Sequence, residues 1–373
     1  MRVGISSEWV GTRAGGLETY SHSLVEALAR LDTDNEYVVY TARRNAFEGL
    51  AHRHPNFSIR FLGSESRWFA VPFGLPFALW SRPVDLFHAT SVVPPVCPAR
   101  LVVTVHDLGF KHHPEFFPPL VRLRLKTLIS SGARRAERII AVSNTTKQDL
   151  VDTFGIPEEK IVVVYEGVSP NYRPIADDEE RRRVLARYGI EGDYVLYVGR
   201  LHVRKNLVRL LQAFARIRRG GASHRLVLVG RKLFDADPLL RAIVDLGLTD
   251  EVLLPGHIPL ADLAHVYSGA TVFVYPSLFE GFGLPPLEAM ACGTPVITSN
   301  VSSLPEVVGD AALLADPRSV DELANAMERL LADVGLRRRC REKGLARVAA
   351  FTWERTARET LAVYSTLLNA SVY

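Results

Sequence analysis

The chain has 373 residues, of which 47% are hydrophobic and 23% charged, and its formal net charge is +4. This composition is that of a globular protein and excludes an intrinsically disordered one. Three widely spaced cysteines form neither a disulfide framework nor a cysteine zinc site. The positive excess is too diffuse to indicate nucleic acid, and we expect no nucleic-acid partner.

We find no opening segment with the charged start and apolar core of a secretory signal. The longest apolar run, Phe69–Trp80, is too short to span a bilayer and contains Pro72 and Pro76. We therefore expect a cytoplasmic protein that is not integral to a membrane.

The first half of the sequence alternates short apolar runs with helical segments. Such alternation predicts a parallel sheet that is covered on both faces by helices. The helical segments include Leu17–Leu31 and Leu120–Ala136. The predicted strands are Arg2–Ser6, Tyr37–Thr41, Ser58–Leu62, Leu86–Ala89, Leu101–Val105, Arg138–Val142 and Ile161–Tyr165.

Two loops at strand ends in this half are candidate ligand contacts. Gly15 and Gly16 precede the first helix, shortly before Tyr20, and paired glycines allow close backbone approach to a ligand; an ordinary turn fits equally well. His106 follows the strand Leu101–Val105, where its imidazole can hydrogen-bond a sugar hydroxyl or simply cap the strand end. His112 and His113 add metal-ligand potential, but nothing else fits a metal site.

A basic segment follows at residues 120–138, where cations alternate with apolar residues. Both a helix lying on anionic lipid and an ordinary surface helix fit this pattern. Its cations are Arg122, Arg124, Lys126, Arg134, Arg135 and Arg138.

The second half repeats the alternation after a linker-like stretch, Gly167–Glu180, that is rich in proline, glycine and acidic residues. We therefore predict a second α/β unit of similar size, with helices that include Val208–Arg219, Ala261–Ser268 and Val320–Ala332. Its predicted strands are Tyr194–Val198, Arg225–Val229, Val252–Leu254, Thr271–Tyr275, Pro295–Thr298 and Ala312–Ala315.

The first strand of this second unit ends in a basic loop. Arg200 and Lys205 lie five residues apart, where a guanidinium and an ammonium suit a diphosphate. Asn206 is predicted to cap the helix that follows. Arg231 and His257-Ile258 come after two further strands of the same unit.

The strand Thr271–Tyr275 leads into a glycine-rich loop and then a helix, predicted to begin at Pro285-Pro286. Gly281 and Gly283 allow close backbone approach, and the helix start favours an anion. Glu280 and Glu288 bracket the loop. Carboxylates repel an anion, so we expect both to accept hydrogen bonds from sugar or ribose hydroxyls. Glu288 alternatively fits a first-turn acid stabilised by the helix dipole.

The segment Phe279–Ile297, with its paired glutamates, resembles the motif of the retaining nucleotide-sugar glycosyltransferases of family 4. The loop with Arg200 and Lys205 resembles that family's donor-phosphate motif, and His106-Asp107-Leu108 resembles its first-domain histidine. The resemblance implies an α/β protein of two Rossmann-like domains facing each other across a cleft, the GT-B fold. It implies an acceptor-side domain at residues 1–170, a nucleotide-sugar domain at 171–351, and a final helix within 352–373 that packs back on the first domain.

The family's site implies a role for each matching residue of this chain. Glu280 and His106 would be catalytic, and Glu288 would bind the ribose. The resemblance also implies that the reaction would need neither a metal nor a separate cofactor. The donor diphosphate would be bound by Arg200, Lys205, Gly281, Phe282, Gly283 and Leu284, the nucleobase by Arg231, His257 and Ile258, and the acceptor or the phosphates by Gly15, Gly16 and Tyr20.

The sequence thus predicts transfer of a hexose from a nucleoside diphosphate sugar to a glycan or lipid-linked acceptor, with retention. The phrase Phe351–Glu354, with Tyr364 beyond it, resembles the tails of bacterial mannosyltransferases that use GDP-mannose. GDP-mannose is accordingly the favoured donor, with a UDP-hexose second. The alternative reaction on the same fold is that of a nucleotide-sugar epimerase. The expected location is cytoplasmic, including the inner face of the membrane if the basic segment contacts lipid.

Overall fold

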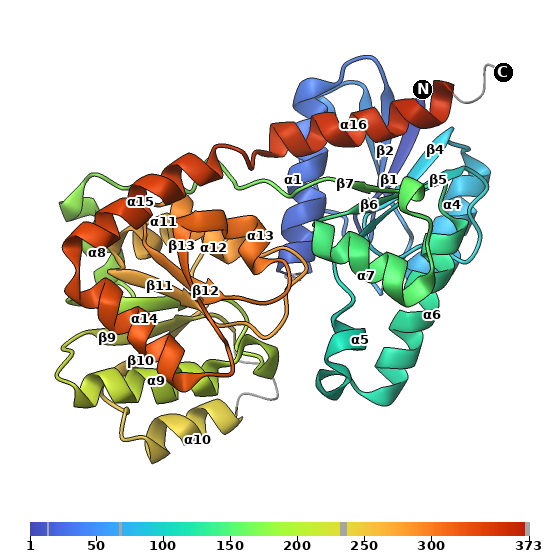
Figure 1. Cartoon of the computed structure of the whole chain (residues 1–373). Helices are drawn as coiled ribbons and strands as arrows, with labels where there is room; N and C mark the ends of the chain where they lie inside the picture. Colours follow the sequence, from blue (N-terminus) through green and yellow to red (C-terminus); the bar gives the residue numbers. More distant parts are fainter. Residues whose placement is uncertain (13–14, 67–68, 232–236, 370–373) are drawn as a thin grey trace. The chain divides into compact units, whose positions relative to one another are not determined.

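The chain folds into two compact α/β units (Figure 1). The computed structural model describes residues 1–12, 15–66, 69–231 and 237–369, so the last four residues of the predicted final segment lie outside the described residues. Unit 1 comprises Met1–Gly167 and Thr352–Tyr373, and unit 2 comprises Val168–Phe351. Each unit contains one parallel sheet, which confirms the predicted fold class.

Unit 1 is built on a seven-stranded sheet of order β3-β2-β1-β4-β5-β6-β7. The chain runs outward from β1 to β3 and then returns to build the other half of the sheet. The order therefore reverses between β1 and β4, and ligands bind at such switch points in open α/β sheets. The strands are β1 Arg2–Ser6, β2 Glu36–Thr41, β3 Phe57–Phe61, β4 Leu86–Ala89, β5 Arg100–Val105, β6 Arg138–Ala141 and β7 Ile161–Val163.

Side chains along these strands alternate between two layers of helices. Phe87 and Val103 enter a hydrophobic cluster with residues of α4, α6 and α7. Their strand neighbours His88 and Thr104 face the opposite layer, where they bond to side chains of α16 and α1. The helices of this unit are α1 Gly16–Leu31, α2 Leu50–Arg53, η1 Ala70–Gly74, α4 Leu75–Ser81, α5 Gly109–His112, η2 Pro114–Phe116, α6 Pro119–Arg135, α7 Asn144–Phe154, η3 Glu158–Lys160 and α16 Trp353–Asn369.

The terminal helix α16 belongs to unit 1 although it is remote in sequence. The hydroxyl of Thr356 donates to the carbonyl oxygen of Tyr165 at 2.7 Å. A Cβ on Gly167 would lie only 2.3 Å from the backbone nitrogen of Trp353, so the two chain segments pass in a contact that only glycine permits. The Trp353 ring in turn packs edge-on against Tyr20 of α1.

Unit 2 is built on a six-stranded sheet of order β10-β9-β8-β11-β12-β13, so its order reverses between β8 and β11. The strands are β8 Tyr194–Val198, β9 Arg225–Val229, β10 Val252–Gly256, β11 Val272–Tyr275, β12 Val296–Ser299 and β13 Ala312–Ala315. The helices are α8 Asp178–Ala186, η4 Val203–Lys205, α9 Leu207–Arg219, α10 Asp237–Asp245, α11 Leu260–Gly269, α12 Leu284–Ala291, α13 Leu304–Val308, η5 Gly309–Ala311, α14 Val320–Ala332 and α15 Val334–Val348.

Every predicted strand is found within two residues of its predicted bounds. The helical stretch Ala70–Ser81 was not predicted, because Pro72 and Pro76 argue against a helix. Pro76 lies in the first turn of α4, the part of a helix that best tolerates proline. Among the helices that the structure describes, none combines the length and hydrophobicity of a membrane span.

Tyr364 is the residue whose hydroxyl fastens α16 to the sheet. Its oxygen lies 2.7 Å from Nδ1 of His88, and Nε2 of His88 lies 2.7 Å from the Thr104 hydroxyl. Burial lowers the pKa of His88 to about 3, so the imidazole is neutral and has one donor and one acceptor nitrogen. Each hydroxyl can serve either nitrogen, which leaves the buried ring fully bonded.

We predict that Tyr364→Phe lowers the free energy of unfolding by about 1–3 kcal/mol, because it leaves a buried nitrogen of His88 without a partner. Urea unfolding followed by circular dichroism measures the change. Ser365→Ala is the matched control, since it deletes an exposed hydroxyl from the same helix. Equal unfolding midpoints for the two variants would contradict the anchoring role.

Candidate functional site

The loop between β11 and α12 is shaped by hydrogen bonds to its backbone. The hydroxyl of Ser303 donates to the carbonyl oxygens of Glu280 and Phe282, at 3.0 and 2.6 Å, and the Glu280 N–H donates to Ser302. Gly283 has a φ of 121° at the N-cap of α12, and a Cβ there would lie 2.8 Å from Leu304. The backbone conformation of the loop thus requires glycine at this position.

The loop after β8 is tied to the loop after β11, because these two strands are neighbours in the sheet. Asn206 provides one tie: its side-chain amide donates to the carbonyl oxygens of Pro276 and Pro317, at 3.1 and 2.6 Å. Asn206 is the N-cap residue of α9, but its φ is 61° and its side chain makes no cap hydrogen bond. The predicted side-chain capping by Asn206 was therefore wrong.

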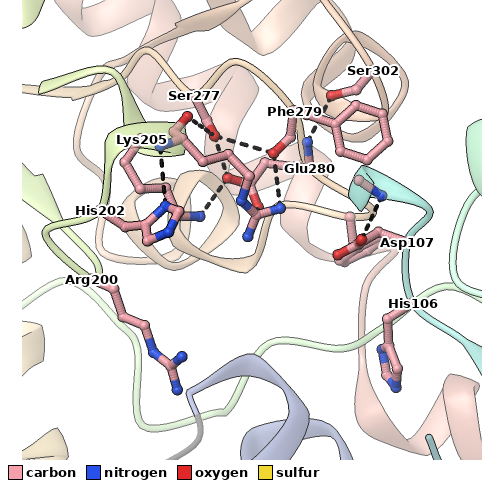
Figure 2. A network of polar contacts seen from close by, with 12 residues as sticks. His106, Asp107, Arg200, His202, Lys205, Ser277, Phe279, Glu280 and Ser302 are labelled. Carbon is pink, nitrogen blue, oxygen red and sulfur yellow. Dashed lines mark hydrogen bonds and ion pairs between the residues drawn. The ribbon is translucent and has the colours of Figure 1, made fainter. Parts of the chain in front are cut away.

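Lys205 and Glu280 form a buried ion pair at the centre of this site (Figure 2). The Lys205 ammonium donates to Glu280 Oε1 and, at 2.6 Å, to the Tyr275 hydroxyl. Tyr275 and Ser277 also donate to Oε1. This oxygen therefore accepts hydrogen bonds from three side chains. The Lys205 ammonium in turn contacts Tyr275 on β11 and Glu280 in the loop that follows it.

The second carboxylate oxygen of Glu280 has a different environment. Among the described residues, the Arg204 guanidinium lies 3.9 Å from Oε2, beyond hydrogen-bonding distance. Arg204 instead donates to the carbonyl oxygen of Phe279 at 3.1 Å. Oε2 thus has the capacity to accept a hydrogen bond from a ligand.

The charge state of Glu280 follows from these neighbours. Burial by itself raises the pKa of the carboxyl, but the positive charges of Lys205 and Arg204 outweigh it and, with hydrogen bonds from Lys205 and Ser277, lower the pKa to about 2. Glu280 is therefore a carboxylate at neutral pH. Arg204 is a functional candidate that the sequence did not single out, since a cation in a loop is ordinarily only solvated.

Arg200 occupies the same loop as Lys205 but in a different setting. Its side chain is exposed, and Figure 2 shows it apart from the Lys205–Glu280 pair. The hydroxyl of Tyr197 donates to the Arg200 carbonyl oxygen at 3.0 Å and fixes the backbone there. The two predicted diphosphate cations thus differ: Arg200 is at the surface, whereas Lys205 is neutralised by Glu280.

Glu288 lies on α12 and is partly buried. Tyr267 donates to its Oε2 at 2.8 Å. Burial raises the pKa of Glu288 to about 7, although hydrogen bonds from Tyr267 and Tyr172 act in the opposite direction. The two glutamates of the motif therefore have opposite pKa shifts, because Lys205 and Arg204 lie beside Glu280 and no cation among the described residues acts on Glu288.

The predicted nucleobase residues follow β9 and β10, at the same edge of the sheet. Arg231 accepts a backbone hydrogen bond from Leu201 at 3.1 Å, which joins its loop to the loop after β8. His257 is exposed, whereas Ile258 is buried. Backbone hydrogen bonds thus link the loop after β8 to the loop after β9, and that loop to the end of β10.

The predicted unit 1 residues lie at the carboxyl edge of its own sheet or just behind it. Gly15 is the N-cap of α1 with a φ of 70°, and Gly16 begins the helix. Tyr20 is fully buried, with its hydroxyl 2.9 Å from the Thr104 hydroxyl and its ring edge-on to His106. Tyr20 therefore supports the histidine from the interior of the unit.

Both ring nitrogens of His106 face acceptors. Nδ1 lies 3.2 Å from the Glu166 carboxylate, and Nε2 lies 2.9 Å from the carbonyl oxygen of Thr90. Burial acts to lower the pKa of His106, but the Glu166 carboxylate, the Thr90 carbonyl and Asp107 together raise it. Two acceptors favour the doubly protonated imidazolium, and a sugar contact through either nitrogen requires one of these hydrogen bonds to break.

Comparisons with known proteins match both units. The family model described as Glycosyltransferase Family 4 matches residues 14–172, and the model described as Glycosyl transferases group 1 matches residues 178–347. O-antigen chain mannosyltransferase B of Escherichia coli is 36% identical over 286 residues, which are 76% of this chain and 74% of that protein. Serotype-specific mannosyltransferase WbdA of Escherichia coli is 30% identical over 241 residues, 64% of this chain but 30% of that longer protein.

The fold has a similar counterpart among solved structures. Sucrose-phosphate synthase from Thermosynechococcus elongatus superimposes with a TM-score of 0.81 at 25% sequence identity, covering 99% of this chain and 100% of that one. The folds of both units, the paired glutamates of unit 2 and the matched sequences thus agree with the resemblance noted in the sequence. The chain belongs to the family 4 glycosyltransferases.

Proposed function

We propose that this enzyme transfers mannose from GDP-mannose to a hydroxyl of a glycan or lipid-linked acceptor, with retention at the anomeric carbon. Mannose is favoured because both relatives described above are mannosyltransferases by name. The tail segment Phe351–Glu354 pointed to the same donor in the sequence.

The observation that carries the proposal is the two-sided environment of Glu280. Oε1 is held by Lys205, Tyr275 and Ser277, which fixes the carboxylate in one orientation. Oε2 is left for the ligand. A fixed anion with one accepting oxygen suits a sugar hydroxyl in the ground state and the positive charge that develops on the sugar as its bond to phosphate breaks.

The cations of the same loop suit the leaving group. Arg200, Arg204 and Lys205 bring three positive charges, and Glu280 balances one of them, so two remain. A nucleoside diphosphate sugar has two negative charges on its diphosphate, and charge on the leaving diphosphate grows as the glycosyl bond breaks. The start of α12 adds partial positive charge. This arrangement can stabilise the leaving group without a metal ion.

The remaining roles are assigned from the predicted site. Glu288 accepts hydrogen bonds from the ribose hydroxyls, and the backbone around Arg231, His257 and Ile258 contacts the base. In unit 1, His106 contributes to sugar binding, and the loop at Gly15-Gly16 contacts the acceptor or the phosphates. No residue is assigned as a covalent nucleophile.

A thermal-shift panel of GDP, UDP, ADP and their sugar conjugates, with EDTA present, tests the donor. We expect GDP and GDP-mannose to raise the melting temperature and the other nucleotides to have little effect, because specific binding stabilises the folded state by mass action. A shift with UDP ligands alone would replace mannose by a UDP-hexose. No shift with any nucleotide would contradict the roles of Arg200, Lys205 and Glu288.

Glu280→Gln is predicted to lower the rate of sugar transfer by at least about a hundredfold, the usual cost of removing one charge-stabilising group. Nucleotide binding should be largely intact, because the phosphate-binding cations and Glu288 are retained. Transfer is measured with radiolabelled donor, and nucleotide binding by thermal shift.

The matched control is Glu328→Gln, which removes an exposed carboxylate from α14 of the same unit. We expect this control to transfer at the wild-type rate. Near-normal transfer by Glu280→Gln would refute its catalytic role. Release of an epimer of the donor sugar without added acceptor would instead assign the epimerase reaction.

Affinity for GDP-mannose should rise as the pH increases toward 7. Glu288 has a pKa of about 7 in the free enzyme, and ribose hydroxyls donate better to its ionised form. Below that pH, binding must first remove the proton, so affinity falls by up to about tenfold per pH unit. The donor diphosphate, being a diester, does not titrate in this range. Calorimetric titrations from pH 5.5 to 8 should show this dependence in wild type and a flatter one in Glu288→Gln; parallel profiles would exclude Glu288 as the ribose acceptor.

A further inference from the structure

Unit 1 exposes a row of large aromatic side chains at Phe69, which directly precedes η1, and on η1 and α4. Phe69, Phe73, Phe77 and Trp80 are 57%, 62%, 74% and 79% exposed. Among the described residues, no other phenylalanine or tryptophan is so exposed. Their spacing of four, four and three residues places all four on one side of a helix. We call this row the aromatic stripe.

The opposite side of the same segment is buried. Leu75, Ala78 and Leu79 pack into the hydrophobic cluster of unit 1 and are at most 4% exposed. The segment is therefore firmly seated on the sheet, and the aromatic stripe is its outward face. Soluble monomers rarely expose such contiguous apolar surface unless it binds a partner or a membrane.

A second apolar surface lies on the same layer of unit 1. In α6, Leu120 and Leu123 are 79% and 62% exposed, whereas Leu125 and Ala133 contribute to the cluster that also receives α4. Because α4 and α6 share this cluster, their outer surfaces belong to the same layer of helices (Figure 1). The first two turns of α6 thus add a second exposed apolar surface to unit 1.

The charge of both segments identifies the partner. Between Glu65 and Asp85 the sequence contains Arg67 and Arg82 and no acidic residue. Between Glu115 and Glu137 it contains five arginines or lysines and again no acidic residue. Phenylalanine, tryptophan and leucine, in segments that contain cations and no acidic residue, form the composition of surfaces that bind at an anionic lipid interface. A second copy of the chain would bring the same positive charge against itself.

We propose that the aromatic stripe and the first two turns of α6 dock unit 1 onto an anionic bilayer, with the aromatic rings in the headgroup layer and the cations on the lipid phosphates. The docking does not depend on the identity of the sugar donor. It assigns the aromatic stripe a role beside the basic segment that the sequence had suggested. For the lipid-linked class of acceptor in the proposed function, docking would bring the enzyme to the surface that carries the acceptor.

Flotation of the full chain with vesicles tests the proposal without donor or acceptor. Wild type should float with phosphatidylcholine vesicles that contain about 30% phosphatidylglycerol, because this anionic lipid gives the vesicle a negative surface potential. It should not float with phosphatidylcholine alone, and salt should weaken the binding because the attraction is partly electrostatic.

The variant Phe73→Ser, Phe77→Ser, Trp80→Ser should bind anionic vesicles more than about tenfold more weakly, since binding strength scales with buried apolar area. Its matched control is Val244→Ser, Leu260→Ser, Val334→Ser, which removes three side chains of unit 2 that are 66–68% exposed and should bind like wild type. Arg122→Gln with Arg124→Gln should lose about tenfold or more on anionic vesicles, from roughly 1 kcal/mol per cation near the surface.

All substituted side chains are exposed, so melting curves by circular dichroism should overlay and show that each variant is folded. Equal flotation of the aromatic variant and wild type would overturn the proposal, as would the failure of wild type to float with anionic vesicles. Light scattering provides a further test: concentration-dependent dimers that disappear in the aromatic variant would assign the aromatic stripe to a second copy and refute lipid docking.

Discussion

The ion pair between Lys205 and Glu280 is the interaction on which the unit 2 site depends. Removing two charges from water is costly, and their attraction compensates only when the remaining donors and acceptors are also satisfied. Tyr275 and Ser277 supply that satisfaction from the strand and loop beside the pair. The pair can form because β8 and β11 are neighbours at the point where the strand order reverses. One constraint of topology thus brings together two residues that are 75 positions apart in the sequence.

The same pair explains why two glutamates of one motif behave differently. Glu280 is held as a carboxylate by Lys205 and Arg204, whereas burial raises the pKa of Glu288, whose described hydrogen-bond partners are the hydroxyls of Tyr267 and Tyr172. A permanent anion suits the reacting sugar, and a group that titrates near neutrality suits a hydrogen-bonding contact to ribose. Opposite shifts of this kind are consistent with the different roles that we propose for two chemically identical side chains.

Unit 1 relies on a polar network of another kind, in which no member needs a charge. Tyr364, His88, Thr104 and Tyr20 are linked by hydrogen bonds in a buried chain, and the ring of Tyr20 reaches His106. Buried polar groups rigidify a structure when all are satisfied. Here they join the terminal helix, two central strands and the first helix. The last helix of the sequence thereby supports the candidate catalytic residue His106.

Sequence patterns determined the strands, most helices and the identity of the candidate site. Apolar runs bounded by glycine and proline are local signals, and the motif around Glu280 and Glu288 is unusually specific. Tertiary structure decided what depends on neighbours far along the chain. Asn206 bonds to the carbonyl oxygens of Pro276 and Pro317 instead of capping its own helix, and Arg204 approaches Glu280 only because two strands pair. The aromatic stripe could not be predicted from the sequence, because an apolar run does not reveal which of its residues will be buried against the sheet. Local sequence fixes backbone preference and hydrophobicity, whereas burial, partners and pKa values arise only when distant segments pack together.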